Sequence, residues 1–250
     1  MNNKMKQSTK KPCRLNFKWI LTLASLAACV AQAQSEAPLS SFYTPSYRGQ
    51  STSESAFWND SFTNAYGGPN NASSLAPIGI TLANASVTQT TPGAFIIGGA
   101  AGDIYSFSSI NTFVLSYSVS NPANFPDGIG DIVFQTETVG SELDYSSVLL
   151  SYDTGTGTQT FSATRNELYR DTEVTGFGPS SDVLSEWELN LPTDTDVTSF
   201  SIFFNGSGTS LGLERTMLDV SPVPEPSTLA LAGLGLGLIC LRFLRHQPAH

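Results

Sequence analysis

The central part of this 250-residue chain contains no cysteine, no histidine and no lysine. All of these residues lie before residue 34 or after residue 221. A body without them cannot form a disulfide bond, and it cannot hold zinc through imidazole or thiolate ligands. It also lacks the side chains on which most nucleophilic catalysis depends. Only carboxylate chemistry remains, so the sequence favours a body that is not an enzyme.

Positive charge is equally scarce in this body. Residues 34–221 contain four arginines, against 20 aspartates and glutamates. An excess of negative charge repels the phosphates of nucleic acids and the headgroups of anionic lipids. We therefore expect no nucleic-acid partner, and a body that stays in solution and can collect divalent cations.

The first 33 residues have the three parts of a secretory signal peptide. Six of the 12 lysines and arginines lie before residue 20, and an apolar run follows at residues 20–30. Ala31 and Ala33 then occupy the positions that a signal peptidase reads, which predicts cleavage before Gln34. A second interpretation stays open, because residues 26–29 resemble the lipobox of bacterial lipoproteins, in which Cys29 would be lipidated. Both interpretations predict export.

The last 30 residues, 221–250, also have three parts. An apolar segment at residues 228–241 follows a short motif and precedes a basic end at residues 242–250. The motif consists of Val223, Pro224, Glu225, Pro226 and Ser227. The apolar segment is predicted to be a transmembrane helix, although it is shorter than the roughly 20 residues of a typical span. Arg242 and Arg245 follow it and predict a cytoplasmic end with an outward-facing body.

This tail resembles the PEP-CTERM sorting signal. The resemblance implies that an exosortase, a membrane protease, recognises the chain and cuts it near residues 224–226 while the helix holds it in the inner membrane. It also implies a Gram-negative bacterium that makes exopolysaccharide, and a mature body at the cell surface or in the extracellular matrix of a biofilm. The alternative is a surface protein anchored permanently in the membrane behind a proline-rich stalk.

The body divides into a Ser/Thr/Pro-rich lead-in at residues 34–55 and a domain at residues 56–220. Apolar and polar residues alternate in several runs of this domain, which predicts strands with one buried face. The clearest runs are residues 112–119, 147–152, 186–191 and 199–204. Gly- and Asp-rich turns such as 153–157 separate them. We predict an all-β fold, an antiparallel β-sandwich of jelly-roll-like form, with one short helical turn at residues 163–169.

Two glutamates are the candidates for catalysis. Glu186 and Glu188 flank Trp187 and share one strand face, with Cα atoms about 7 Å apart. A pair of carboxylates on either side of a sugar can hydrolyse a glycosidic bond, so the alternative function is a polysaccharide hydrolase. We prefer a solvated face opposite a buried tryptophan, because nothing in the sequence indicates the burial that a general acid requires.

Two further pairs of residues give weaker expectations. Asp127 and Asp131 enclose a glycine-rich segment and offer the oxygen ligands that Ca²⁺ takes, but the EF-hand spacing is missing and a plain turn is preferred. No other cofactor or metal is indicated. Alternation places Phe57 and Trp58 on opposite faces of a strand, so we expect at most one of them to be buried. The sequence thus predicts a non-catalytic exported protein, with exopolysaccharide as the candidate partner.

Overall fold

The structure is a computed structural model that describes residues 36–72, 84–175, 178–192 and 196–223. The predicted signal peptide with Ala31, Ala33 and Gln34 lies outside the described residues. So do the tail from Pro224 onward and its basic residues, Arg242 and Arg245. In the parts of the chain that are described, no helix is long and apolar enough to cross a membrane.

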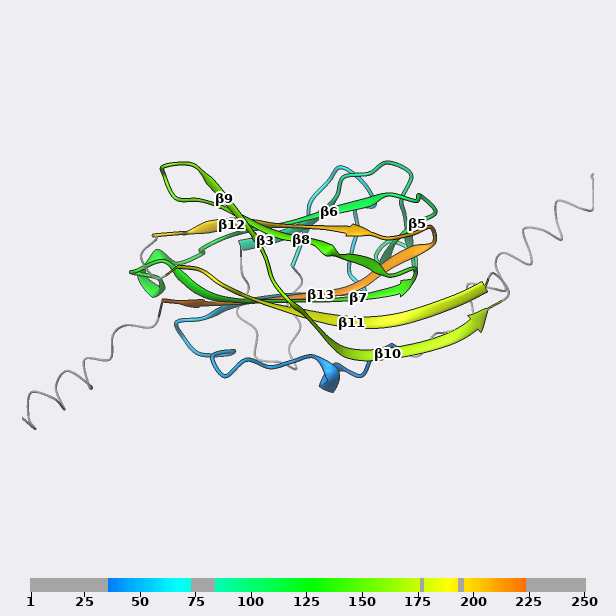
Figure 1. The fold of residues 1–250 in the computed structure, drawn as a ribbon, viewed down its shortest axis with the longest axis horizontal. Helices are drawn as coiled ribbons and strands as arrows, with labels where there is room; N and C mark the ends of the chain where they lie inside the picture. The colour runs from blue at the N-terminus through cyan, green and yellow to red at the C-terminus, as the bar shows by residue number, and fades with distance from the viewer. Residues whose placement is uncertain (1–35, 73–83, 176–177, 193–195, 224–250) are drawn as a thin grey trace, which may run out of the picture.

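Two antiparallel sheets pack face to face, as Figure 1 shows. The larger has seven strands in the order β10-β11-β7-β13-β5-β4, and β1 pairs with β13 beside β5. Its strands are β1 (Glu54–Asn59), β4 (Phe95–Ile97), β5 (Asp103–Ser106), β7 (Ile129–Gly140), β10 (Arg165–Thr175), β11 (Gly178–Asn190) and β13 (Leu211–Pro222). The smaller sheet has six strands in the order β2-β3-β6-β12-β8-β9. Its strands are β2 (Asn70–Asn71), β3 (Asn84–Gln89), β6 (Asn111–Ser118), β8 (Leu143–Asp153), β9 (Thr158–Ser162) and β12 (Ser199–Gly206).

The predicted all-β sandwich is therefore confirmed. Single 3₁₀ turns, η1 (Leu39–Ser41) and η2 (Pro122–Asn124), are the helical elements among the described residues. The arrangement of two antiparallel sheets is consistent with the predicted jelly-roll-like form.

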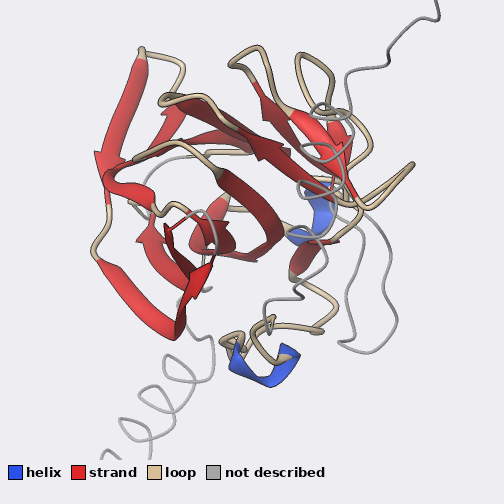
Figure 2. Ribbon diagram, turned by 90° about the vertical axis from the view of Figure 1, so that its right-hand side faces the viewer, coloured by secondary structure: helices blue, strands red, loops and turns tan. Residues whose placement is uncertain are grey.

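Aromatic rings join the two sheets across the core. Phe134 of β7 lies against Phe204 of β12, with ring centroids 5.2 Å apart. Phe134 also stacks on Trp187 of β11, and Phe204 stacks on Phe113 of β6, at 5.4 and 5.1 Å. Contacts of this kind bury large apolar areas and hold the layers together. Figure 2 shows the strands of both layers curving around this core.

The six-stranded sheet follows the predicted alternation. Along β6 every second residue, beginning with Asn111, is buried, and β12 shows the same period of two. The outer face of this sheet is therefore open to solvent, as one-sided antiparallel sheets usually are. The predicted turn at residues 153–157 joins β8 to β9 as a hairpin, closed by a hydrogen bond from Thr154 N to Gly157 O of 3.3 Å.

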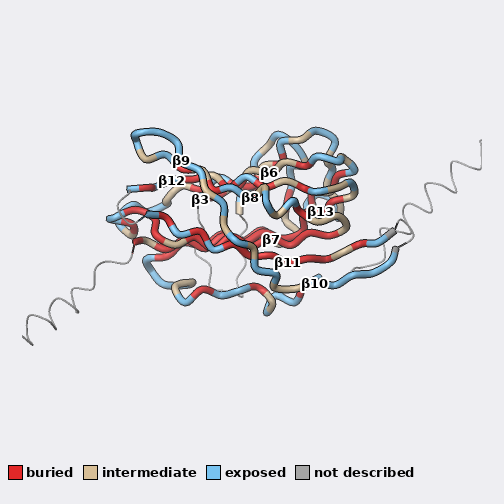
Figure 3. Tube along the Cα trace, viewed as in Figure 1, coloured by how far each residue is buried: buried red, intermediate tan, exposed pale blue. Residues whose placement is uncertain are grey.

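The central strands of the seven-stranded sheet are instead buried on both faces, while its edge strand β10 is largely exposed. Every residue of β13 from Leu211 to Ser221 is buried, and in Figure 3 β7 and β13 are red along most of their length. The part of the lead-in that is described and precedes β1, residues 36–53, runs below the outer face of this sheet, in blue in Figure 1. Arg48 attaches it there: its Nε and Nη2 atoms donate to the two carboxylate oxygens of Asp219 at 2.8 and 2.5 Å.

The lead-in explains why Phe57 and Trp58 are both buried, contrary to our expectation. The Trp58 side chain faces the core, where its Nε1 donates to Asn70 O at 2.8 Å. Phe57 belongs to a small second core with Phe42 of the lead-in, and their rings meet edge to face at 5.6 Å. The expectation was wrong because it assumed that one face of the strand meets water.

The helical turn predicted at residues 163–169 is also wrong. Most of this segment begins β10, which pairs with β11 along ten registered positions from Arg165 to Thr175. The register shifts between Glu167 and Tyr169, so Leu168 is the extra residue of a bulge. Leu168 packs against the second core. The local sequence suits a helix, but pairing with a long neighbouring strand overrides that preference.

Candidate functional site

A set of acidic side chains gathers around Arg215 on the seven-stranded sheet. We call these residues the acidic cluster: Asp60, Asp103, Glu137, Asp182 and Glu214. Their charges act on one another strongly enough to shift several of their pKa values. Such a grouping is costly in a protein interior, because each buried carboxylate loses the hydration that stabilises its charge.

The pairing of β13 brings three of these acids together. One edge of β13 pairs first with β5 and then with β1. Glu214 lies between these two partners, at a shift in the register with β7. Asp60 directly follows β1, where its N–H donates to Glu214 O at 3.4 Å, and Asp103 is the first residue of β5. The end of one strand and the start of another therefore place Asp60 and Asp103 next to Glu214.

The other edge of β13 supplies the remaining two acids. Glu137 of β7 is registered opposite Arg215, and its Oε2 accepts a hydrogen bond from Arg215 Nε. Ala37 of the lead-in completes this contact, since its N–H donates to Glu137 Oε1 at 2.7 Å and its carbonyl accepts from Arg215 Nη2. The Arg215–Glu137 ion pair is thus satisfied by the lead-in. Asp182 lies on the next strand, β11, opposite Val139 of β7.

Asp182 and Glu214 are buried without such a partner. Their exposed fractions are 2% and 8%. Neither oxygen of Asp182, nor Oε2 of Glu214, meets a hydrogen-bond donor in the described parts of the chain. One carboxylate oxygen from each of Glu137, Asp182 and Glu214 lies within 4.8 Å of the others. Buried polar atoms are normally satisfied, so unpartnered carboxylate oxygens that face one another require an explanation.

Protons are one way to relieve this repulsion. Burial, followed by the charge of Glu137, raises the pKa of Glu214 to about 9. The pKa of Asp182 is raised as well, by burial first and then by the nearby carboxylate of Glu137. A proton on one of these two carboxyl groups would allow it to donate to the other, since neither Asp182 oxygen meets another donor in the described residues. Burial and the charge of Asp60 also raise the pKa of Asp103 to about 7. The cluster therefore retains protons at neutral pH.

The two glutamates predicted as candidates for catalysis are placed differently from each other. They share the outer face of β11, opposite the buried Trp187, as predicted. Glu188 is exposed, but Glu186 is only 3% exposed, so the expected solvated face is wrong at that residue. Asn166 of β10 covers it and donates to Glu186 Oε2 at 3.3 Å. Burial, and then the charge of Glu188, raises the pKa of Glu186, while the Asn166 hydrogen bond lowers it.

The loop between Asp127 and Asp131 packs against the end of β13 and Val223, where the C-terminal tail begins. Asp127 is exposed, and Asp131 accepts a hydrogen bond from Ser221 Oγ at 3.3 Å. Val223, the first residue of the predicted sorting motif, is 8% exposed and donates its N–H to Gly128 O at 3.1 Å. A Cβ atom at Gly130 would lie 2.8 Å from the Pro222 carbonyl oxygen, so the close approach requires glycine. The calcium site predicted at Asp127 and Asp131 stays a prediction.

A hollow of about 440 Å³ lies beside the end of β13 and is lined by Tyr47, Asp131, Ser221 and Val223 among others. The fold thus holds the chain firmly up to Val223. The remaining residues of the motif, 224–227, follow directly and lie outside the described residues.

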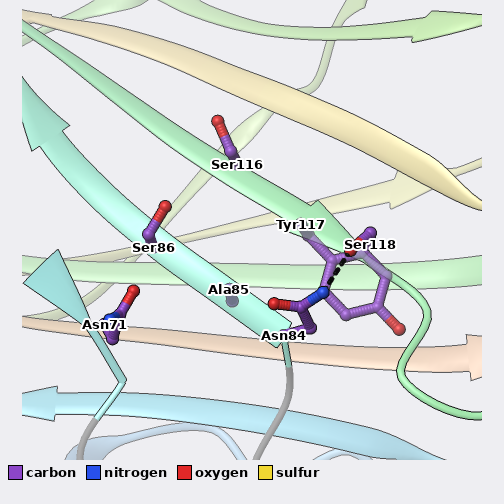
Figure 4. A pocket seen from close by; sticks show the side chains of 7 residues that line it. All are labelled: Asn71, Asn84, Ala85, Ser86, Ser116, Tyr117 and Ser118. Atoms are coloured by element: carbon purple, nitrogen blue, oxygen red, sulfur yellow. Dashed lines mark hydrogen bonds between the residues drawn. The ribbon is translucent and has the colours of Figure 1, made fainter. Parts of the chain in front are cut away.

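The outer face of the six-stranded sheet has a row of hydroxyl groups. Five residues on five neighbouring strands are registered side by side in the order Ser86, Ser116, Ser201, Ser151 and Thr160. All are exposed or half-buried. Figure 4 shows the side chains of Ser86 and Ser116 on the same side of their strands, above a shallow hollow of about 250 Å³.

An apolar row runs parallel to these hydroxyl groups, two residues further along the strands. Phe203 of β12 is registered between Val114 of β6 and Leu149 of β8. Phe203 and Leu149 are 40% and 39% exposed, which is unusual for side chains of this size. The face therefore combines a flat apolar strip with a line of hydroxyl groups one strand spacing, about 4.8 Å, apart.

Sequence reasoning did not find the acidic cluster. Its members are separated by 32 to 45 residues, and no motif spacing connects them. One signal was present: Glu214-Arg215 interrupts a largely apolar segment at residues 211–220, which also contains Thr216 and Asp219. A charge pair inside a strand that reads as fully buried indicates an internal electrostatic site.

Comparison with known proteins agrees with the sequence motif of the tail. Residues 222–245 match the model of the PEP-CTERM protein-sorting motif. No curated protein matches the chain. The motif indicates export and sorting to the cell surface in Gram-negative bacteria, and it implies processing by an exosortase, a membrane protease. The chain is therefore an exported protein that carries a PEP-CTERM sorting motif directly after the last strand of a β-sandwich.

Proposed function

We propose that the β-sandwich is a non-catalytic component of the cell surface or of the exopolysaccharide matrix, and that it contacts polysaccharide through the outer face of the six-stranded sheet. Sorting by an exosortase delivers it there after a stage in the inner membrane. The observation that carries the glycan contact is the exposed row around Phe203 beside the row of hydroxyl groups from Ser86 to Thr160.

The chemistry of that face suits a sugar polymer. A pyranose ring has an apolar face, which stacks on exposed aromatic rings, and hydroxyl groups at its edge, which form hydrogen bonds with hydroxyl and amide groups. The hydroxyl row crosses five strands, so it provides contacts over several sugar units rather than one. Because serine hydroxyl groups both donate and accept, the row needs no change of charge to match the hydroxyl groups of a neutral sugar.

Binding can be measured with the full chain and exopolysaccharide purified from the same bacterium. Phe203→Ala is expected to lower affinity about 3- to 10-fold, the range for the loss of one aromatic stacking contact. Phe107→Ala is the matched control, because Phe107 is also an exposed phenylalanine, 58% exposed, and follows β5 of the other sheet. Equal affinity of Phe203→Ala and the unchanged protein would contradict the proposed face.

Sorting is tested independently of polysaccharide binding. Replacing Pro224 and Glu225 by alanine is expected to hold the protein in the inner membrane, because the exosortase no longer recognises its motif. Intact-mass analysis of the unchanged protein from its host should show the loss of residues beyond the motif. A mature form that retains residues 229–245 would contradict processing and would support a permanent anchor.

A polysaccharide hydrolase is the second candidate, because burial raises the pKa of Glu186 as a general acid requires. Release of reducing ends from the polysaccharide would indicate this activity. Glu186→Gln should then abolish the release, while Glu188→Asp should reduce it. Binding without release is the result that the non-catalytic function predicts.

A further inference from the structure

The unpartnered oxygens of the acidic cluster point to a ligand of a particular kind. Glu137, Asp182 and Glu214 come from three adjacent strands of one sheet, and each presents an oxygen within 4.8 Å of the other two. Both oxygens of Asp182 are buried and face no donor in the described parts of the chain. A cation between such buried acceptors would stabilise them, in place of the protons that otherwise reduce their repulsion.

The arginines close to the acidic cluster already have other partners. Arg215 is bound to Glu137 and to the carbonyl of Ala37. Arg48 forms its buried ion pair with Asp219, further along β13. Asp182 and Glu214 therefore have no arginine partner when they are ionised, and one divalent cation would balance both charges and displace their protons.

The candidate ligand atoms favour Ca²⁺ over other metal ions. Every candidate ligand is a carboxylate oxygen, and the body has no histidine or cysteine to attract zinc or copper. Ca²⁺ takes about six to eight oxygen ligands, whereas Mg²⁺ demands near-ideal octahedral geometry and usually keeps several waters. Ca²⁺ also tolerates irregular geometry, as strands fixed by a sheet impose.

We propose that Glu137, Asp182 and Glu214 form a Ca²⁺-binding site beneath the lead-in. Each of the three contributes one carboxylate oxygen, and the second oxygen of Asp182, which also meets no donor in the described residues, can bind as well. The cation joins β11, β7 and β13 from the outer face. Glu137 also accepts a hydrogen bond from the Ala37 N–H. A cation bound to Glu137 therefore stabilises the contact of the lead-in with the sheet.

The full chain, stripped with EDTA and exchanged into metal-free buffer, is titrated with CaCl₂ and separately with MgCl₂ by calorimetry. Thermal unfolding is followed in parallel. At a calcium concentration about 100 times the Kd, Tm is expected to rise by about 5 to 10 °C. Mg²⁺ should bind more weakly than Ca²⁺. No heat of binding and no rise in Tm with calcium would overturn the proposal, and tighter binding of Mg²⁺ would overturn the choice of cation.

Two variants remove ligands without removing volume. Asp182→Asn and Glu214→Gln each replace a buried carboxyl group by an uncharged amide of the same size, so both are expected to fold without calcium, as circular dichroism will check. Each should lower the calcium affinity at least 100-fold. Glu188→Gln, on the same face of β11 but exposed, should bind calcium like the unchanged protein.

A third variant separates this site from the one predicted in the loop. Asp127→Asn should leave the rise in Tm with calcium intact. Loss of that rise in Asp127→Asn, with its retention in Asp182→Asn and Glu214→Gln, would move the calcium to the loop and overturn the proposal.

Discussion

The two sheets of this sandwich differ in how many of their faces are buried. The six-stranded sheet is buried on one face, and its outer face carries serine, threonine and the exposed Phe203. The central strands of the seven-stranded sheet are buried on both faces, because the lead-in covers their outer side with Ala37 and Phe42. Polar residues on the first sheet meet water, whereas polar residues on these covered strands must find partners within the protein.

The same contrast holds within the seven-stranded sheet, where β10 is an exposed edge strand and β13 is a covered central strand. Arg170 of β10 pairs with Glu142 and Glu167 at the surface, where water screens the charges. Arg215 of β13 pairs with Glu137 in the interior. The same substitution should therefore affect stability more at a covered position than at an exposed one. The expected differences are given from the largest to the smallest.

The largest difference is expected between two arginines. Arg215→Met leaves Glu137 as a buried charge without a partner, which should lower the free energy of unfolding by about 3–5 kcal/mol. Arg170→Met removes an ion pair that is about one-third exposed and should cost less than about 1 kcal/mol. Urea unfolding monitored by tryptophan fluorescence measures both. Equal losses would mean that the lead-in does not exclude water from Arg215.

Two phenylalanines on the outer faces provide the next comparison. Phe57 is 1% exposed beneath the lead-in, and Phe57→Ala should cost about 3–4 kcal/mol, as large-to-small substitutions in cores do. Phe203→Ala, on the open face, should cost about 1 kcal/mol or less. The midpoints of urea unfolding will show the difference. A small loss for Phe57→Ala would contradict the close packing of the lead-in on the sheet.

The pH dependence of stability should reveal the acidic cluster in metal-free protein. Asp182 and Glu214 have folded-state pKa values above their ordinary values of about 4, so the folded state binds more protons than the unfolded state. Their stabilisation is complete below pH 4 and is lost as the pH rises towards about 9. The slope is at most about 1.4 kcal/mol per pH unit for each group.

Urea midpoints in EDTA at pH 5, 7 and 9 measure this slope. Glu214→Gln should reduce it, while Glu188→Gln, the exposed control, should not. A midpoint that rises between pH 5 and pH 9 would contradict the raised pKa values. Glu142 acts in the opposite direction at low pH, because its hydrogen bond with Arg170 lowers its pKa to about 2.

The smallest difference is expected between two serines. Ser55 Oγ donates to Asp219 Oδ1 at 2.7 Å in the covered face, and Ser55→Ala should cost about 1–2 kcal/mol because it weakens the support of a buried charge. Ser116→Ala, in the exposed hydroxyl row, should change stability by less than about 0.5 kcal/mol. Thermal unfolding resolves this difference. A large loss for Ser116→Ala would mean that the row has a structural role rather than a binding role.

The six-stranded sheet, whose outer face is exposed, is the part of the fold that the sequence predicts well. The alternation at residues 112–119 and 199–204 became β6 and β12, because a sheet with one wet face separates polar from apolar residues along each strand. The prediction failed where both faces of a strand are covered by other parts of the protein. Phe57 and Glu186 lie on faces that other segments cover, and β10 forms because β11 offers it a long edge to pair with.

The sequence by itself determined the PEP-CTERM motif, with the export that it indicates, and the all-β class, because each depends on residues that are close together in the chain. Only the tertiary structure decided that the lead-in closes one sheet, that Glu137, Asp182 and Glu214 converge, and that serines from five strands form one row. These features depend on strand order and register, which bring together residues separated by tens of positions in the sequence. A local pattern carries no information about which distant strand will lie beside it.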